Sequence, residues 1–310
     1  MGPVAESSPF SLNEPPVPDR DLDLEIVRQV LREQFPGLSL TSVEHLGSGW
    51  ERDAYLVDHR VVVHFPRYAE VAEELDAHAA ILALVHASAG SAVAVPRITF
   101  RGRAGEHFPH RFFGHNLIPG VGAGEAPASA ALAGELGRAL SAIHAIPPER
   151  ARGIGIRPED ADCGSAFLAL VDQAKQIDRL DDTAPGAMEW LRGPPAIPAP
   201  YAGPPRFIHN DLSAEHILVD PDSGRLAGII DWSGAALGDP SLDFSYLLLL
   251  HGREFLDAAL AEYRLPVDKG FLDRTVFRAR VRGLGWLVDA LHRNADPARG
   301  LRAVENAFAG

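Results

Sequence analysis

The densest group of polar side chains lies in the segment FIHNDLSAEHILVD, residues 207–220. His209, Asp211 and His216 fall within eight positions here, and apolar residues precede and follow them. Because their spacing fits neither a helical nor a strand period, they indicate a loop held between two buried segments. Loops of this kind are where a rigid scaffold places reactive groups.

A further carboxylate, Asp231, ends the apolar segment LAGIID, which is typical of a buried strand. Mg²⁺ binds in proteins through one or two carboxylates together with waters and substrate phosphates. The two segments therefore predict a magnesium site in which His216 and Asp231 hold the metal. Asp211 could then accept the proton of an attacking hydroxyl, which is how kinases divide the work of phosphoryl transfer.

Two other interpretations of these residues compete with this one. A zinc hydrolase could use His209, Asp211 and His216, but the sequence has neither an H-E-x-x-H helix nor a clear further histidine segment. A lone His or Asp in a loop is more often a turn or capping residue. Here two separated segments match the arrangement of a kinase site in both residue type and spacing, which argues against that interpretation.

The rest of the chain must position these groups, and its hydrophobic periods divide it into a strand-rich beginning and a helix-rich remainder. Before the Pro119-Gly120 turn we expect helices over 21–34 and 69–87 and strands over 41–46, 53–57, 60–65, 95–100 and 111–117. After it we expect helices over 130–146, 165–180, 241–250, 255–263 and 271–293, strands over 217–219 and 226–230, and a proline-rich loop over 193–205.

The segment HNDLSAEHILVD, followed by GIIDWSGAALGDPSLDF, resembles the catalytic and metal-binding segments of the aminoglycoside phosphotransferase family. That family usually reads H-x-D-x-x-x-x-N, and here His216 takes the last position. The motif is most similar to that of the aminoglycoside 2''-phosphotransferases, with the macrolide kinases next. The resemblance extends over about residues 46–250. It implies that Asp211 is the catalytic base, that His216 and Asp231 are metal ligands, and that His209 and Asp243 support the catalytic loop.

The same resemblance implies an α+β, two-lobed, protein-kinase-like fold. It has a small, mainly β N-lobe with one long helix and a larger, mainly α C-lobe. We therefore expect a loose arm over 1–19, a nucleotide-binding N-lobe over 20–117, and a catalytic and acceptor-binding C-lobe over 118–310. The implied function is Mg²⁺-dependent transfer of the γ-phosphoryl group of ATP or GTP to a hydroxyl of an aminoglycoside, which confers resistance. The alternatives are a macrolide or other natural-product acceptor, and a kinase fold that binds its ligand with impaired transfer.

The nucleotide is expected against the first part of the chain. Gly47, Ser48 and Gly49 lie between the first two predicted strands, where the phosphate-covering loop of a kinase belongs, although G-S-G alone could be a hairpin turn. Asn116 and Ile118 follow the last predicted strand and are expected at the hinge that reads the nucleobase. There is no Walker-type G-x-x-x-x-G-K-[ST] motif.

The third strand of a kinase lobe should carry a Lys for the phosphates, and the next helix a Glu that orients it. Here His64 and His78 occupy both positions. The two histidines could be packed side chains, or they could contact the triphosphate in a weaker or pH-dependent way. They could also mark the loss of ATP-dependent transfer or the use of another donor. Arg60 or Arg67 could partly replace the missing cation, with different reach and geometry.

Acceptor groups are expected on the helices beyond the catalytic loop, where acidic side chains would bind ammonium groups and tryptophans would line a pocket. The candidates are Asp172, Asp178, Asp181, Asp182, Glu262, Asp289, Trp190, Trp232 and Trp286. Each acidic residue could equally belong to a solvated helix face, and each tryptophan to the core.

Composition sets the remaining limits. The 310 residues carry a formal net charge of −13, which argues against nucleic acid and suits a cationic small molecule, although solubility alone would explain it. The single Cys163 excludes a disulfide framework within the chain. No apolar run approaches the ~20 residues that span a bilayer, and no signal peptide begins the sequence. We expect a monomeric cytoplasmic enzyme without membrane contact.

Overall fold

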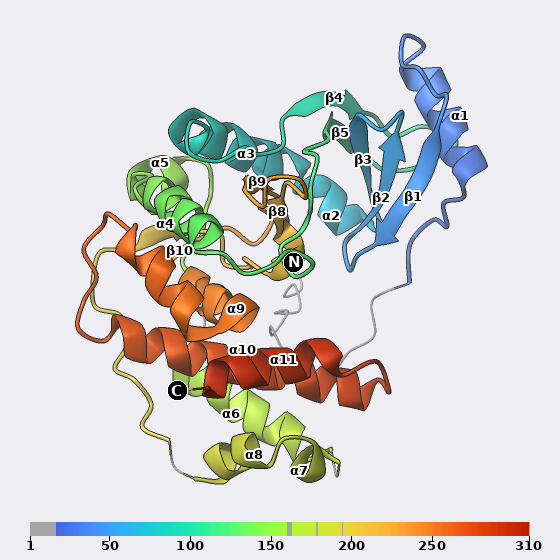
Figure 1. The fold of residues 1–310 in the computed structure, drawn as a ribbon. Coiled ribbons are helices and arrows are strands. Elements are labelled where there is room, and N and C mark those ends of the chain that lie inside the picture. Colours follow the sequence, from blue (N-terminus) through green and yellow to red (C-terminus); the bar gives the residue numbers. More distant parts are fainter. Residues whose placement is uncertain (1–16, 160–162, 178, 194, 310) are drawn as a thin grey trace.

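The computed structural model describes residues 17–159, 163–177, 179–193 and 195–309 (Figure 1). Of the arm expected over 1–19, only residues 17–19 fall among them. The described chain has an α+β fold in which an antiparallel sheet near the N-terminus is followed by a mainly helical part. No helix in the described ranges is long and apolar enough to cross a membrane.

The N-terminal sheet has five antiparallel strands in the order β1-β2-β3-β5-β4. Their bounds are Val43–Ser48 (β1), Arg52–Val57 (β2), Val61–Pro66 (β3), Ile98–Gly102 (β4) and Phe112–Asn116 (β5). Asp58 and His59 both adopt positive φ (49° and 52°), and the Arg60 amide donates to the Val57 carbonyl at 3.0 Å. This is the type I′ turn that suits the twist of a two-residue hairpin.

Alternation along the strands gives this sheet two different faces. Tyr55, Val63 and Phe65 point to one face, where they share a buried cluster with helix α1 (Leu24–Gln34). The opposite face receives helix α3 (Leu75–Ala89), whose His78 ring stacks on Phe113. The helix expected over 69–87 is divided, because the Glu74 amide bonds to the Val71 carbonyl at 3.3 Å in a tighter turn and separates α2 (Ala69–Glu73) from α3.

The remainder of the chain is built from helices, with two small sheets between them. The helices are α4 (Ala130–His144), α5 (Pro148–Gly153), α6 (Cys163–Ala174), α7 (Leu180–Thr183), α8 (Pro185–Arg192), α9 (Ser241–Ala261), α10 (Phe271–His292) and α11 (Ala298–Phe308). The strands are β6 (Val121–Gly122), β7 (Arg206–Ile208), β8 (Ile217–Val219), β9 (Leu226–Ile229) and β10 (Ala236–Gly238), paired as β6-β8-β9 and β10-β7.

Most long helices lie where the sequence predicts them. The helices expected over 241–250 and 255–263 are the two halves of α9, which is kinked at His251 and Gly252 (φ 79°). The Asn306 side chain of α11 donates to the Leu249 carbonyl at 2.9 Å, beside the kink. The helices α5, α7, α8 and α11 and the short strands β6, β7 and β10 were not predicted from the sequence.

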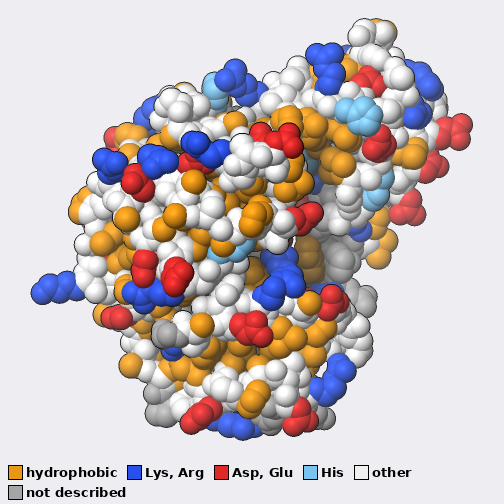
Figure 2. Space-filling model, viewed as in Figure 1, with side chains coloured by type: hydrophobic (Ala, Val, Ile, Leu, Met, Phe, Trp, Pro, Cys, Tyr) orange, Lys and Arg blue, Asp and Glu red, His pale blue; other side chains and the backbone are white. Residues whose placement is uncertain are grey.

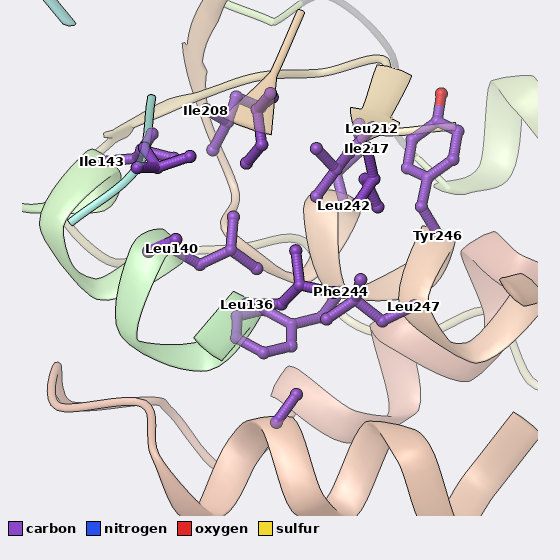
Figure 3. Close-up of a cluster of buried hydrophobic side chains, with 14 of the residues drawn as sticks. Leu136, Leu140, Ile143, Ile208, Leu212, Ile217, Leu242, Phe244, Tyr246 and Leu247 are labelled. Carbon is purple, nitrogen blue, oxygen red and sulfur yellow. The ribbon is translucent and has the colours of Figure 1, made fainter. Parts of the chain in front are cut away.

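The main core of the helical part lies directly beneath the segment 207–220. Figure 3 shows Leu212 and Ile217 of that segment packed with Leu242 of α9 and with leucines of α4. In the same view the Tyr246 hydroxyl points out of the apolar cluster. The apolar residues of this segment thus anchor the loop in the core, and its polar side chains lie on the side of the loop away from the core.

Candidate active site

The segment that carries Asp211 enters from β7 and leaves through β8, as expected for a loop between two buried segments. Asn210 adopts a left-handed backbone (φ 69°), which Asn tolerates better than most residues. Its side-chain amide donates to the Gly234 carbonyl at 3.0 Å. The sharp turn at Asn210 directs Asp211 away from the core, and the Asp211 side chain is 52% exposed.

The fully buried carboxylate of Asp243, on α9, holds this loop from behind. It accepts the backbone amides of His209 at 2.8 Å and of Asn210 at 2.9 Å. The His144 ring of α4 contacts the same carboxylate at 3.0 Å. Burial alone would raise the pKa of Asp243, but the hydrogen bond and charge of His144 hold it below its usual range. Asp243 therefore stays ionised and ties the loop to two helices.

Tyr246, one turn further along α9, fixes one oxygen of Asp211. Its hydroxyl donates to Oδ1 of Asp211 at 3.0 Å and to the Asn210 carbonyl at 3.2 Å. The guanidinium of Arg282, on α10, lies 4.5 Å from the centre of the Tyr246 ring. A partly exposed carboxylate with one oxygen engaged keeps the other oxygen available for a proton.

His216 and Asp231 face each other beside Asp211. His216 Nδ1 lies 2.7 Å from the Asp211 carbonyl oxygen, so this nitrogen donates and Nε2 faces Oδ2 of Asp231 at 3.5 Å. When a metal ion binds, an unprotonated Nε2 offers its lone pair, so that Nε2 and the Asp231 carboxylate could hold the cation between them. Asp231 itself has a left-handed backbone (φ 55°), a strained conformation that is more frequent at functional sites.

The carboxylate of Asp231 is ready to bind a cation. The protein around it would by itself raise the pKa. However, the charge of His216, the hydrogen bond from Ser233 at 2.8 Å and the charge of Arg52 lower the pKa of Asp231 to about 2. In the described residues no three His, Cys, Asp or Glu side chains form a ready-made metal cage. One carboxylate and one imidazole instead fit a divalent cation whose other ligands are phosphate oxygens and water.

The buried ring of His209 does not join His216 and Asp231 as a possible metal ligand. Its Nε2 lies 2.9 Å from the Ile230 carbonyl and donates to it, while Nδ1 accepts the Asp211 amide at 3.3 Å. Both ring nitrogens are thus occupied within the protein, which leaves no lone pair for a metal. This geometry opposes the zinc-hydrolase interpretation and makes His209 a bridge between the loop and the end of β9.

On the sheet side, His64 and His78 form part of an aromatic cluster. Each ring stacks on Phe113, with a centroid distance of 5.3 Å in both cases. His64 Nε2 lies 2.9 Å from Nε2 of His115, whose Nδ1 in turn donates to the Asn116 carbonyl at 2.8 Å. Burial is the main cause of the lowered pKa of all three histidines, and it lowers that of His78 to about 3. The rings are therefore neutral at pH 7.

The other residues predicted to bind nucleotide lie in separate places. Ser48 lines a hollow of about 720 Å³ together with Tyr55 and residues near α1. Asn116 and Ile118 line a different cavity of about 430 Å³ with the end of α3. The Asn116 side chain accepts the Arg97 amide at 2.8 Å and is thus engaged within the protein. Within the described chain these two cavities share no lining residue.

The loop after Gly47 and Ser48 approaches the helical part. The Trp50 ring lies 5.7 Å from the guanidinium carbon of Arg293, at the end of α10. Figure 2 shows the surface hollowed between the sheet part and the helical part, with Lys or Arg side chains beside the hollow. The hairpin, the catalytic loop and α10 thus lie around one region.

Comparison with known proteins gives the family. Residues 42–277 match the APH family model, which describes the phosphotransferase enzyme family. This chain belongs to the APH phosphotransferase family.

The curated relatives match only short segments of this APH phosphotransferase. Viomycin phosphotransferase of Streptomyces vinaceus is 31% identical over 91 residues, and the uncharacterized protein YcbJ of Bacillus subtilis (strain 168) is 42% identical over 57. These segments are 29% and 18% of this chain, and 30% and 18% of the two relatives.

Solved structures resemble this APH phosphotransferase over most of its length. The GDP complex of wild-type aminoglycoside 2'-phosphotransferase-IIIa has a TM-score of 0.68 and 26% identity, covering 92% of this chain and 98% of that one. The GDP and kanamycin complex of APH(2'')-IIIa has the same score and identity, covering 91% and 98%. The apoenzyme of macrolide 2'-phosphotransferase MphH from Brachybacterium faecium, at 20% identity, shows a shared fold (TM-score 0.63, covering 93% and 98%). The expected kinase-like fold and family are thereby confirmed.

Three of the six acidic residues expected to bind the acceptor of this phosphotransferase pair with basic side chains. Asp172 pairs with Lys175 on an exposed face, Glu262 pairs with Arg138 and Arg264, and Asp289 pairs with Arg293. Asp178 and the Asp181 side chain lie outside the described residues. Trp190 and Trp232 pack in the interior, whereas Trp286 lies beside Tyr246, with ring centres 6.2 Å apart. Trp232 packs against the His209 ring from within the core, with ring centres 4.6 Å apart.

Three residues beside Asp211 and Asp231 were not predicted from the sequence: Arg52, Tyr246 and Arg282. Tyr246 lies within the apolar run SYLLLL and thus resembles a core residue. Its spacing of three from Asp243 places both side chains on one face of α9, which was the available signal. For Arg282 the sequence offers no such signal, because helix α10 carries several arginines at similar spacing.

Proposed function

We propose that this APH phosphotransferase transfers the γ-phosphoryl group of ATP or GTP to a hydroxyl of a small antibiotic-type molecule, with an aminoglycoside as the first candidate acceptor. The observation that carries the proposal is the arrangement around Asp211. Its carboxylate is half exposed and is held by Tyr246 through one oxygen. The two proposed metal ligands, His216 and Asp231, lie directly beside it.

The proposed roles follow from this geometry. Asp211 accepts the proton of the acceptor hydroxyl, while His209 and Asp243 keep the loop in place. His216 and Asp231 would hold Mg²⁺, which supplies charge neutralisation for the phosphates when bound. We also infer that residues 20–117 form the donor lobe and 118–310 the acceptor lobe, and that the reaction takes place in the cytoplasm, where nucleoside triphosphates are made.

The choice of an aminoglycoside rests on the net charge of −13 and on the 26% identity to a kinase solved with kanamycin. One observation favours a second candidate, a macrolide or another acceptor with few positive charges. Among the described residues Arg282 has no ion-pair partner, and its guanidinium covers the tyrosine that holds Asp211. A cation in this place repels ammonium groups.

The test is a substrate panel of aminoglycosides and macrolides, each with ATP and with GTP. Release of nucleoside diphosphate and a mass gain of one phosphoryl group on the acceptor are measured. Asp211→Asn should lower kcat about 10²–10⁴-fold, the usual contribution of a general base. Asp222→Asn, at an exposed turn beyond β8, is the matched control and should keep full activity. Unchanged turnover in Asp211→Asn would refute the proposal.

A further inference from the structure

The donor side of this protein lacks the amine that a kinase lobe uses to hold phosphates. The chain has two lysines, Lys175 and Lys269, and neither lies in the N-terminal sheet. His64 and His78, which occupy the positions of the expected Lys and Glu, are neutral rings stacked on Phe113. If the protein binds a triphosphate here, the fixed positive charge has to come from an arginine.

Most arginines of the sheet are unsuitable in position or are already paired. Arg60 is exposed at the far end of β3. Arg67 lies 3.6 Å from Asp53, whose side chain belongs to the α1 side of the sheet. Arg101 and Arg111 both pair with Asp76, on the exposed surface. Of the two substitutes suggested by the sequence, Arg60 thus lies at the far end of the strand and Arg67 is held on the α1 side of the sheet.

Arg52 does share that face. In the register of β2 with β3, Ala54 lies opposite His64, and Arg52 lies two residues before Ala54. Residues two apart on a strand point to the same side of the sheet. Arg52 is also the first residue of β2 after the glycine hairpin, where the Gly49 amide donates to the Arg52 carbonyl at 2.9 Å. Its position is therefore fixed by the loop that would cover the phosphates.

The Arg52 side chain is enclosed but incompletely paired. It is only 10% exposed, and in the part of the chain that the structure describes its one ion pair joins Nη1 to the more exposed Glu51 carboxylate at 3.3 Å. Its Nε is shielded from solvent and has no hydrogen-bond partner among the described residues. Guanidinium donors enclosed in this way normally find acceptors, so the arrangement points to a ligand that supplies them.

The electrostatics place the Arg52 charge between the two halves of the site. Burial is the main cause of the lowered pKa of His64 and of His78, and the charge of Arg52 adds to it. Against the effect of burial, the same charge helps to lower the pKa of Asp231 at the end of β9. A phosphate chain bound to a cation at Asp231 would thus run toward this guanidinium.

We propose that Arg52 is the residue that binds the donor phosphates, in place of the strand lysine of other kinases, with His64 and His78 as neutral packing groups behind it. The inference rests on the proposed phosphotransferase function. A guanidinium can bind two phosphate oxygens at once through its planar fork, and Glu51 orients it from the neighbouring position.

The test measures binding of nucleotide directly, without an acceptor. Calorimetric titrations with ATP and GTP, and with the nucleosides adenosine and guanosine, give the ratio of triphosphate to nucleoside affinity. Arg52→Ala should reduce this ratio at least about tenfold, which corresponds to about 1.4 kcal/mol. Nucleoside affinity should stay unchanged, because a general structural defect would lower both affinities. Arg60→Ala removes the same charge from an exposed position of the same sheet and should leave the ratio as in the wild type.

A variant that restores the Lys and Glu of other kinases provides a second test. In Arg52→Ala/His64→Lys/His78→Glu the Lys and Glu of other kinases are restored, and the ratio should recover toward the wild-type value. A ratio that Arg52→Ala leaves unchanged would overturn the role of Arg52 while the phosphotransferase function stands. A wild-type protein that binds no triphosphate at all, with Mg²⁺ present, would overturn both.

Discussion

The hydroxyl of Tyr246 donates a hydrogen bond of 3.0 Å to Oδ1 of Asp211. Burial raises the pKa of Tyr246 well above its usual value, so the hydroxyl keeps its proton and always donates. Tyr246 is itself fully packed between α9 and the Arg282 side chain. The orientation of the Asp211 carboxylate, the proposed general base, is therefore set by a side chain that sequence patterning assigns to the core.

Replacing this hydroxyl tests its role. Tyr246→Phe keeps the ring but leaves Asp211 free to rotate, and we expect kcat to fall about 10- to 100-fold, since hydrogen bonds to charged groups contribute about 1.5–3 kcal/mol. The KM for the nucleotide should stay within twofold or so, because the donor side is untouched. Steady-state kinetics with saturating acceptor measure both constants. A variant with wild-type kcat would show that Asp211 needs no such support.

The buried carboxylate of Asp243 should matter for stability as well as for the loop. Asp243→Asn leaves a neutral group among two backbone amides and the His144 ring, and we expect the free energy of unfolding in urea to fall by about 3–5 kcal/mol. Asp257→Asn lies on the same helix in an exposed pair with Arg253, and is the control, with an expected change within about 0.5 kcal/mol. Equal effects of the two variants would contradict this account.

The cluster of His64, His78 and His115 should make stability depend on pH. In the folded protein the pKa of each is below the ordinary value of 6.5, so the unfolded chain binds more protons as the pH falls. Stability is then fully present above about pH 6.5 and is lost below it, by up to about 1.4 kcal/mol per pH unit for each histidine. For His78 the loss continues to about pH 3.

Urea unfolding at pH 7.5 and at pH 5 measures this dependence. In His78→Phe the unfolded chain should bind about one proton fewer relative to the folded protein, so the free energy of unfolding should depend less on pH. The new ring can still pack on Phe113. His59→Gln, at an exposed turn, should leave the slope unchanged. A steeper profile in His78→Phe than in the wild type would show that His78 is charged in the folded state.

The crossing of α4 and α9 should tolerate no added methyl group at Gly137. A Cβ on this residue would collide with the backbone carbonyl of Ala259, which cannot yield as a flexible side chain could. Gly137→Ala should lower the free energy of unfolding by about 1–3 kcal/mol through displacement of the two helices. Gly186→Ala, in α8, has open space around the new methyl and should be neutral or slightly stabilising. Thermal unfolding of both variants decides the point.

Long elements and the catalytic segment could be predicted from sequence because their signals are local. The apolar periods of α4 and α10, and the loop from His209 to His216 with its flanking apolar residues, are complete within a few turns of chain. The strands β7 and β10, of three residues each, carry no period of their own and form through pairing with each other. Arg52 was missed for a similar reason. Its place on the same face as His64 depends on how β2 pairs with β3, and the order of residues in the sequence does not reveal that pairing.

The absence of lysine from the N-terminal sheet has a chemical consequence. Nucleotide probes that acylate an amine beside the bound phosphates would pass over this protein, so a search of a cell extract based on them would miss it. A dicarbonyl reagent that condenses with guanidinium groups should instead modify Arg52, and bound triphosphate should protect it. The protein would be found by the arginine it uses rather than by the lysine it lacks.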